Sequence, residues 1–189
     1  MAGFVRGKSP GGLVAVPEED LHVSLSRSVP IRKHQIDTLL SLLRRELRTF
    51  KPFRCTLGDP EVFLNDEKTT CFLAIDIRKG TKELNRLLSC VDRSFRKHRL
   101  PEYYKEPRHH VSIAWAPASM HSQLEAGVAE FKRSQRKTGP AKIGQDWTPA
   151  AIPPAQTQAL GSSHEWQSGM AFTADAVCCK IGKQVTRLT

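Results

Sequence analysis

Two short His-Val-Ser motifs could supply acid–base chemistry, and they occupy residues 22–24 and 110–112. Each motif lies in a short apolar run rich in β-branched or aromatic residues, which favours a β-strand. Successive residues of a strand face opposite ways, so the histidine and the serine of each motif share one face, which in the second motif is expected to include Ala114. If the two strands lie side by side, two imidazoles and two hydroxyl groups converge on one groove.

Two imidazoles can cleave an RNA phosphodiester bond without a metal ion. An unperturbed imidazole has a pKa of about 6.5, so one ring can be neutral and the other charged near neutral pH. One of His22 and His110 would take the proton of the 2′-hydroxyl group, and the other would protonate the departing 5′-oxygen. Ser24 and Ser112 could donate hydrogen bonds to the phosphate oxygens as charge develops there.

Other interpretations of the two motifs stay open or are weaker. A single His-x-Ser in a strand is common and usually marks only a half-buried polar face. Zinc needs a third ligand, and neither motif has a nearby Asp, Glu or Cys in phase with it. No G-x-S-x-G motif or evident aspartate favours serine-hydrolase chemistry. We therefore expect no metal ion and no cofactor.

Composition and charge point to one domain that binds a polyanion. The chain has 189 residues, within the roughly 100 to 200 typical of one domain, and a formal net charge of +10. This charge fits RNA, DNA or an anionic membrane surface. The chain has no apolar run of the roughly 20 residues that a membrane span needs, and we expect no secretion signal and a soluble intracellular protein. The five scattered cysteines indicate neither a disulfide framework nor a zinc site.

The elements that must position the motifs are predicted from hydrophobic periodicity and from the Pro and Gly residues that interrupt it. The expected strands lie at about 21–28, 61–65, 71–77, 110–115, 172–177 and 184–188. The expected helices lie at about 36–50, 81–99 and 124–131. This order predicts an α+β fold, with helices packed on a mainly antiparallel sheet.

The domain organisation follows from the segments without periodicity. Residues 1–20 are Gly-rich and polar, which predicts a flexible leader. Residues 21–189 are expected to form the domain. Within it, the segment at about 134–169 is rich in Pro, Gln, Gly, Ala and Ser, which predicts a disordered insert.

Two aromatic residues, Tyr103 and Tyr104, lie in the loop just before the second motif. Their rings could stack on a nucleobase, a contact worth about 1–3 kcal/mol. They could equally cover the edge of the sheet, and the sequence leaves both alternatives open. His34 and His109 are expected at the surface.

Three segments closely resemble the U6 small nuclear RNA phosphodiesterase family of the 2H phosphoesterase superfamily. They are Leu21-His-Val-Ser-Leu-Ser-Arg-Ser28, Phe72-Leu-Ala-Ile-Asp-Ile77 and Tyr104-Lys-Glu-Pro-Arg-His-His-Val-Ser-Ile-Ala-Trp115. The stretch from Val177 to Lys183 also looks like the final strand of that family. The resemblance covers about residues 20–117 and resumes near residue 177.

The resemblance implies a bilobal fold with a central groove and a nuclear, metal-independent 3′-to-5′ exoribonuclease. Such enzymes trim the oligouridine tail of U6 RNA and leave a 2′,3′-cyclic phosphate or a 3′-phosphate. Carried onto this sequence, His110 would be the base, His22 the acid, and Ser24 and Ser112 the groups that hold the phosphate. Tyr104 would stack on a base. We expect a monomer.

The sequence also departs from the pattern of the family. Members carry a strand and a helix before the first motif, so N-terminal elements of the fold are expected to be missing here, which would leave one lobe incomplete. The alternatives that remain are another 2H activity, on a 2′,3′-cyclic phosphate or a 2′-5′ linkage, and a truncated RNA-binding module without catalysis.

Overall fold

The computed structural model describes residues 12–138 and 169–189, and its main feature is a five-stranded antiparallel sheet of strand order β1-β4-β3-β2-β5. The strands of this sheet are β1 (Val14–Ala15), β2 (Phe53–Leu64), β3 (Thr70–Lys79), β4 (His110–Pro117) and β5 (Ala171–Ala174). A separate two-stranded sheet consists of β6 (Cys178–Ile181) and β7 (Gln184–Arg187). The helices are α1 (Ile36–Leu47), α2 (Thr81–Lys97) and α3 (His121–Thr138). The predicted α+β class is confirmed.

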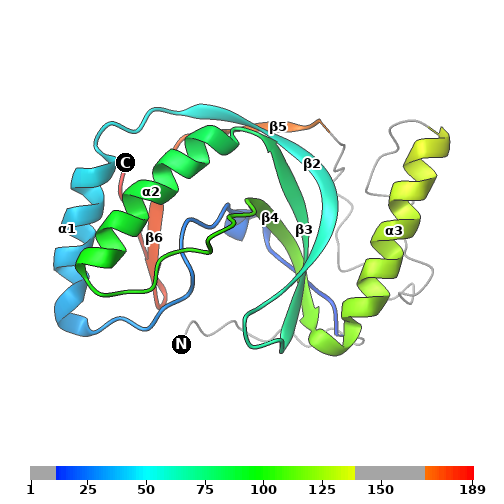
Figure 1. Cartoon of the computed structure of the whole chain (residues 1–189), viewed down its shortest axis with the longest axis horizontal. Helices are drawn as coiled ribbons and strands as arrows, with labels where there is room; N and C mark the ends of the chain where they lie inside the picture. The colour runs from blue at the N-terminus through cyan, green and yellow to red at the C-terminus, as the bar shows by residue number, and fades with distance from the viewer. Residues whose placement is uncertain (1–11, 139–168) are drawn as a thin grey trace.

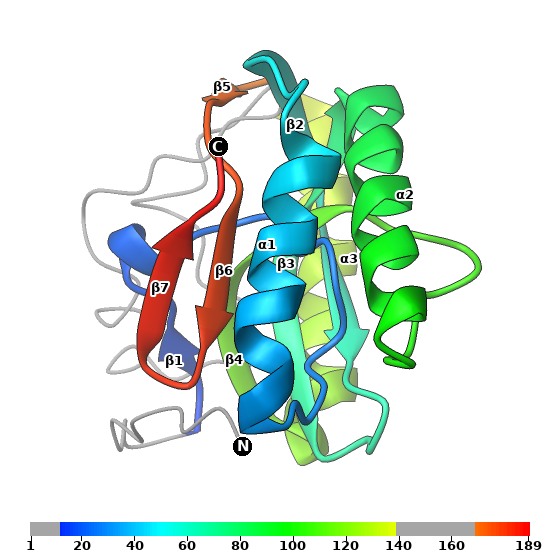
Figure 2. The same ribbon diagram turned by 90° about the vertical axis from the view of Figure 1, so that its left-hand side faces the viewer.

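The helices lie on both sides of the long β2–β3 hairpin. Figure 1 shows α1 and α2 together at one end of the molecule, beside β6, and α3 on the other side of the hairpin. In the view turned by 90° (Figure 2), α1 and the β6–β7 pair lie in front of the sheet and α3 lies behind it. Within the described ranges, no helix combines the length and the apolar character needed to cross a membrane.

Apolar residues spaced four apart explain why α1 and α2 pack together. Helix α1 buries Leu39, Leu43 and Leu47, which fall on one face of the helix. They form one apolar cluster with Val91 and Phe95 of α2. Both helices were predicted from this periodicity, and their existence and position are confirmed.

The β2–β3 hairpin closes on a turn organised by Asn65. Its side-chain oxygen accepts hydrogen bonds from the backbone N–H groups of Thr69 (2.9 Å) and Thr70 (3.0 Å). The hairpin was predicted, but β2 is longer than expected and begins at Phe53. Residues 58–60, Gly-Asp-Pro, lie within β2, at a point where the β2–β3 register is irregular.

The predicted strand at 21–28 is wrong. Within this segment only Val23 pairs with a strand, in one isolated antiparallel bridge to Val111 of β4. The edge of β4 is instead taken up by β1, and the N–H group of Val16 donates to the carbonyl oxygen of Ile113 at 2.9 Å. A 3-10 turn, η1 (Glu18–Asp20), then lifts the chain off this edge before Val23 returns to it.

The predicted flexible leader at 1–20 therefore contains structure in its described part. Residues 1–11 lie outside the described residues. From residue 12 onward the chain supplies β1, and Leu13 is only 1% exposed, packed against Cys71, Leu73 and Leu124. This buried leucine anchors the chain that leads into the first motif.

A β-bulge in β4 changes the side of the sheet to which the side chains after Ser112 point. Ser112 pairs with Ala74 of β3, but the next pair is Ala114 with Leu73, so Ile113 is an extra residue. Ala114 consequently shares the fully buried face of Leu73, and the prediction that it shares the face of Ser112 is wrong.

The C-terminal region differs in part from the expectation. Helix α3 extends to Thr138, beyond the point at which the disordered insert at 134–169 was predicted to begin. Residues 139–168 of that prediction lie outside the described residues. The two closing strands are confirmed as β5 and β7, while β6 falls in the segment that resembled the final strand of the family.

We predict that Gly80→Ala destabilises the protein more than Gly182→Ala does. Both glycines have a positive φ, +94° and +61°, which costs an alanine about 1–2 kcal/mol. A Cβ atom at Gly80 would also lie 2.7 Å from the sulfur of Cys55, whereas nothing lies within 4 Å of one at Gly182. We expect a further loss of about 1–3 kcal/mol in the free energy of unfolding for Gly80→Ala, measured by urea denaturation. Equal losses for the two variants would contradict this packing.

Candidate active site

The two His-Val-Ser motifs meet through the bridge between Val23 and Val111. Because the bridge is antiparallel, His22 lies opposite Ser112 and Ser24 lies opposite His110. Residues directly opposite each other in such a pair share a face of the sheet, with Cβ atoms about 4.5–5.5 Å apart and diagonal neighbours about 7–8 Å apart. The structure thus brings together the four side chains predicted as catalytic and phosphate-binding, and it pairs each histidine with the serine of the other motif.

Both imidazoles are held by the same kind of backbone contact. The Nδ1–H group of His22 donates to the carbonyl oxygen of Asp20 at 2.6 Å, and that of His110 donates to the carbonyl oxygen of Arg108 at 2.8 Å. A carbonyl oxygen can only accept, so Nδ1 carries the proton in both rings. The Nε2 atom of each neutral ring is then the atom available for a substrate proton.

The two histidines differ in their surroundings. His110 begins a paired strand, is half-buried, and lies flat against the ring of Phe63, with centroids 4.1 Å apart and an angle of 18° between the planes. His22 is exposed, because its segment leaves the sheet on either side of Val23 and borders an open groove of about 510 Å³ between α1, α2 and β5.

Burial lowers the pKa of His110 below its ordinary value near 6.5. The positive charge of Arg108 acts in the same direction. The hydrogen bond to the Arg108 carbonyl and the negative charges of Asp76 and Glu61 oppose this shift without cancelling it. His110 is therefore mainly neutral at pH 7, which is the form that can accept a proton.

His109, expected at the surface, is buried, with only 4% of its area exposed. Its Nε2 atom lies 2.8 Å from the side-chain oxygen of Asn85 on α2, to which it donates, and its carbonyl oxygen accepts from the N–H group of Ile77. Burial and the neighbouring His110 lower its pKa. His109 thus fixes the start of β4 against α2 and is not a groove residue. His34 is exposed, as predicted.

Tyr104 lies in a cluster that joins three separate segments. Its hydroxyl group donates to Asp66 in the β2–β3 turn at 2.9 Å, and the guanidinium group of Arg27 lies 4.0 Å from its ring centroid. Arg27 also pairs with Asp66 at 3.6 Å. Tyr103 meets Tyr104 edge to face, with centroids 5.0 Å apart. Tyr104 remains 41% exposed, so a nucleobase could reach it.

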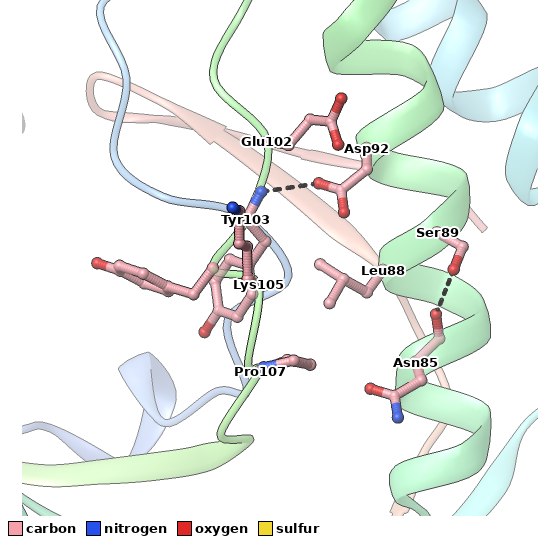
Figure 3. A pocket seen from close by; sticks show the side chains of 9 residues that line it. Asn85, Leu88, Ser89, Asp92, Glu102, Tyr103, Lys105 and Pro107 are labelled. Atoms are coloured by element: carbon pink, nitrogen blue, oxygen red, sulfur yellow. Dashed lines mark hydrogen bonds between the residues drawn. The ribbon is translucent and has the colours of Figure 1, made fainter.

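Tyr103 has a structural role in the same loop. Its backbone N–H group donates to the side chain of Asp92 on α2 at 2.9 Å (Figure 3). A pocket of about 270 Å³ lies between this loop and α2, with Leu88 and Pro107 in its wall. Burial raises the pKa of Tyr103. The loop is therefore attached to α2 on one side and presents Tyr104 on the other.

Sequence reasoning missed three residues around the candidate site. Phe63 stacks on His110, Glu61 pairs with Arg108, and Arg27 covers one side of the Tyr104 ring. Their positions relative to the motifs depend on tertiary structure, which sequence spacing does not define. Alternation along β2 does place Glu61 and Phe63 on one face, but it does not identify the histidine that they approach. Among residues 12–138 and 169–189, no three His, Cys, Asp or Glu side chains gather as a set that could hold a metal ion.

One family model and several curated proteins match this chain. The model of the HVSL family, described as an uncharacterised conserved protein, matches residues 14–189. The proteins named U6 snRNA phosphodiesterase 1 from Mus musculus and Homo sapiens are 34% and 33% identical to this chain over 107 and 104 residues. These matches cover 57% and 55% of this chain, but only 40% and 39% of those relatives.

Solved structures with the same fold include Usb1 of Kluyveromyces marxianus. The structure with uridine monophosphate has a TM-score of 0.54 and 17% identity, and the match covers 94% of this chain and 81% of that one. The structure described without uridine monophosphate has the same TM-score and 20% identity. The resemblance seen in the motifs, and the α+β fold of the 2H phosphoesterase type that it implied, are confirmed.

The lowered pKa values of His109 and His110 predict a loss of stability in mild acid. The unfolded chain takes up protons at these residues near pH 6.5, whereas the folded chain does so only at lower pH. The unfolded state then binds more protons, so the free energy of unfolding should fall as the pH drops from 7.5 to 5.5. Urea denaturation at several pH values measures this slope.

The variant His110→Gln should have a shallower slope than the unmodified protein, because one of the two groups is removed. The exposed His34 provides the matched control, and His34→Gln should keep the original slope. A free energy of unfolding that does not change between pH 7.5 and 5.5 would contradict the assignment.

Proposed function

The chain belongs to the HVSL family, and on this premise we propose that it is a metal-independent 3′-to-5′ exoribonuclease that trims the oligouridine 3′ end of U6 snRNA. The reaction is an attack by the RNA's own 2′-hydroxyl group. Its product is a 2′,3′-cyclic phosphate or, after opening of the ring, a 3′-phosphate. The observation that carries the proposal is the meeting of the two motifs at one bridge, with a protonated Nδ1 atom and an available Nε2 atom in each histidine.

The surroundings of the two histidines support different roles. His110 is neutral at pH 7 because burial lowers its pKa, so its Nε2 atom can take the proton of the 2′-hydroxyl group. The 2′-oxygen then forms a bond to phosphorus, and the bond from phosphorus to the 5′-oxygen of the departing nucleotide breaks. His22, in its charged form, gives the Nε2 proton to that 5′-oxygen. Its exposure lets it regain a proton from water.

The two serines and the basic surface support an RNA substrate. Ser24 and Ser112 are half-buried on the motif face, where their hydroxyl groups can donate to nonbridging phosphate oxygens. The net charge of +10 attracts the RNA backbone. Part of this charge lies on α2, where Lys82 and Arg86 belong to the exposed side of the helix.

The finer parts of the proposal come from the relatives. U6 snRNA as substrate follows the names of the relatives from mouse and human, and a nuclear location follows from that substrate. The matched region spans about 40% of those relatives, so their whole activity is carried over here as part of the proposal. A monomeric enzyme is proposed because both motifs of the site come from one chain.

We predict that the protein shortens a 5′-labelled oligouridine RNA in the presence of a chelator. Each of His22→Ala and His110→Ala should lower the rate by about 10²- to 10⁴-fold, because each removes one proton-transfer group. Each of Ser24→Ala and Ser112→Ala should lower it by about 10²-fold. Gel analysis of the 3′-trimmed ladder measures these rates.

The exposed His34, which belongs to neither motif, serves as the control, and His34→Ala should keep the full rate. An RNA that stays intact with the unmodified protein would overturn the proposal. Hydrolysis of a supplied 2′,3′-cyclic phosphate or of a 2′-5′ linkage without shortening would show another 2H activity. Salt-dependent binding without turnover, unaffected by the histidine variants, would show an RNA-binding module.

We further predict that Tyr104 stacks on a uracil base of the substrate. Arg27 already covers one side of the ring, which leaves the exposed side for a base. The variant Tyr104→Ala should weaken RNA binding by about 1–3 kcal/mol, equivalent to about 5- to 150-fold in KM. Tyr104→Phe keeps the ring and loses only the bond to Asp66, so its KM should stay within a few-fold. Equal KM values for Tyr104→Ala and the unmodified protein would exclude stacking.

A further inference from the structure

The ring of Phe63 reaches the catalytic-type His110 from two strands away. Phe63 belongs to β2, and β3 lies between it and β4. On that intervening strand His110 pairs with Asp76 and Phe63 pairs with Phe72. Ala74 lies between these two on the same face, paired with Glu61 on one side and with Ser112 on the other. Its single methyl group leaves room for the two rings to meet above it, with centroids 4.1 Å apart.

Arg108, another neighbour of Phe63, also contacts His110. The guanidinium group of Arg108 lies 4.8 Å from the ring centroid of Phe63 and is paired with the carboxylate of Glu61. The carbonyl oxygen of Arg108 accepts the Nδ1–H bond of His110. Phe63 thus covers one face of the imidazole and the Arg108 carbonyl holds one edge, while Glu61 pairs with the Arg108 side chain. We name these three residues the imidazole brace.

We propose that the imidazole brace, and Phe63 above all, is a positioning device that fixes the plane of His110 so that its Nε2 atom points at the 2′-hydroxyl group. This inference rests on the proposed function. The hydrogen bond to the Arg108 carbonyl fixes one nitrogen atom but leaves the ring free to tilt about that bond, and the stacked ring removes this freedom. A misplacement of about 1 Å in a reacting group can cost about 10²-fold in rate.

The two motifs differ in this respect. His22 makes the same bond to a backbone carbonyl, but in the described part of the chain no aromatic ring is stacked on it. A base must approach one particular hydroxyl group at hydrogen-bond distance, whereas the exposed acid can also take its proton from water. The brace thus supports His110, whose proposed role as the base requires the more exact placement.

The brace also excludes water from His110. The charged or titratable groups that face this imidazole are Arg108 and His109 from its own segment, Asp76 from β3, Glu61 from β2, and His22 across the bridge. Burial is the largest cause of its lowered pKa. Removal of the Phe63 ring exposes one face of the imidazole to water, so the pKa should return toward 6.5.

The test is a titration of the His110 ring by NMR in the full chain, together with kcat and KM on oligouridine RNA. Phe63→Ala should raise the pKa of His110 and lower kcat by about 10- to 100-fold with KM nearly unchanged. Phe63→Tyr keeps an aromatic ring and should restore both values. Phe63→Leu preserves most of the apolar volume, so it keeps the fold while it removes the flat surface, and its kcat should also fall.

Phe72 provides a matched control because it pairs directly with Phe63 in the hairpin and is half-buried in the same way. Phe72→Ala should leave the pKa of His110 unchanged. The proposal is overturned if Phe63→Ala and Phe63→Leu keep the original pKa and kcat, or if Phe72→Ala shifts the pKa as much as Phe63→Ala. If the unmodified protein cuts no RNA, the NMR titration still decides whether Phe63 holds the ring, independently of the proposed function.

Discussion

One backbone contact, the bridge between Val23 and Val111, determines whether the chain has a single site or two unrelated polar patches. The contact follows from the register of β1 on β4 and from the 3-10 turn that spans Glu18–Asp20. Apolar packing stabilises it, because Val23 joins the buried cluster that contains Val111. Since side chains alternate along a strand, a slip of one residue in this pairing would turn both side chains of the first motif away from the second.

The two halves of the site are alike in chemistry and different in rigidity. Both histidines use a backbone carbonyl two residues earlier to fix the proton on Nδ1. Only His110 stands in a continuous strand, half-buried and covered by an aromatic ring. His22 stands in an exposed segment held by one bridge. This difference fits the roles proposed for them in 2′-hydroxyl attack on a phosphodiester, with His110 as the base and His22 as the acid.

Hydrophobic periodicity predicted the helices and strands that have a local sequence pattern. The prediction failed where pairing between distant segments determines whether a strand forms. Leucines four residues apart marked α1, and a polar turn between two apolar runs marked the β2–β3 hairpin. The two-residue strand β1 has no such pattern, although Leu13 beside it is buried. The apolar run around Val23 indicated a strand, but β1 already occupies the edge of β4 that a longer pairing would need. The four polar residues of the candidate site were predicted because their types repeat. Phe63 was not predicted, because its contact with His110 depends on register across three strands.

The central claim is that His22 and His110 act on the same phosphate group. A crystal structure with a bound dinucleotide that carries a 2′-deoxy group at the cleavage position, and so cannot react, tests it most directly. The account predicts that the Nε2 atom of His110 lies nearest the 2′-position, that of His22 within hydrogen-bond distance of the 5′-oxygen, and the two serine hydroxyl groups on the nonbridging oxygens. A phosphate group that contacts only one of the two motifs would contradict it.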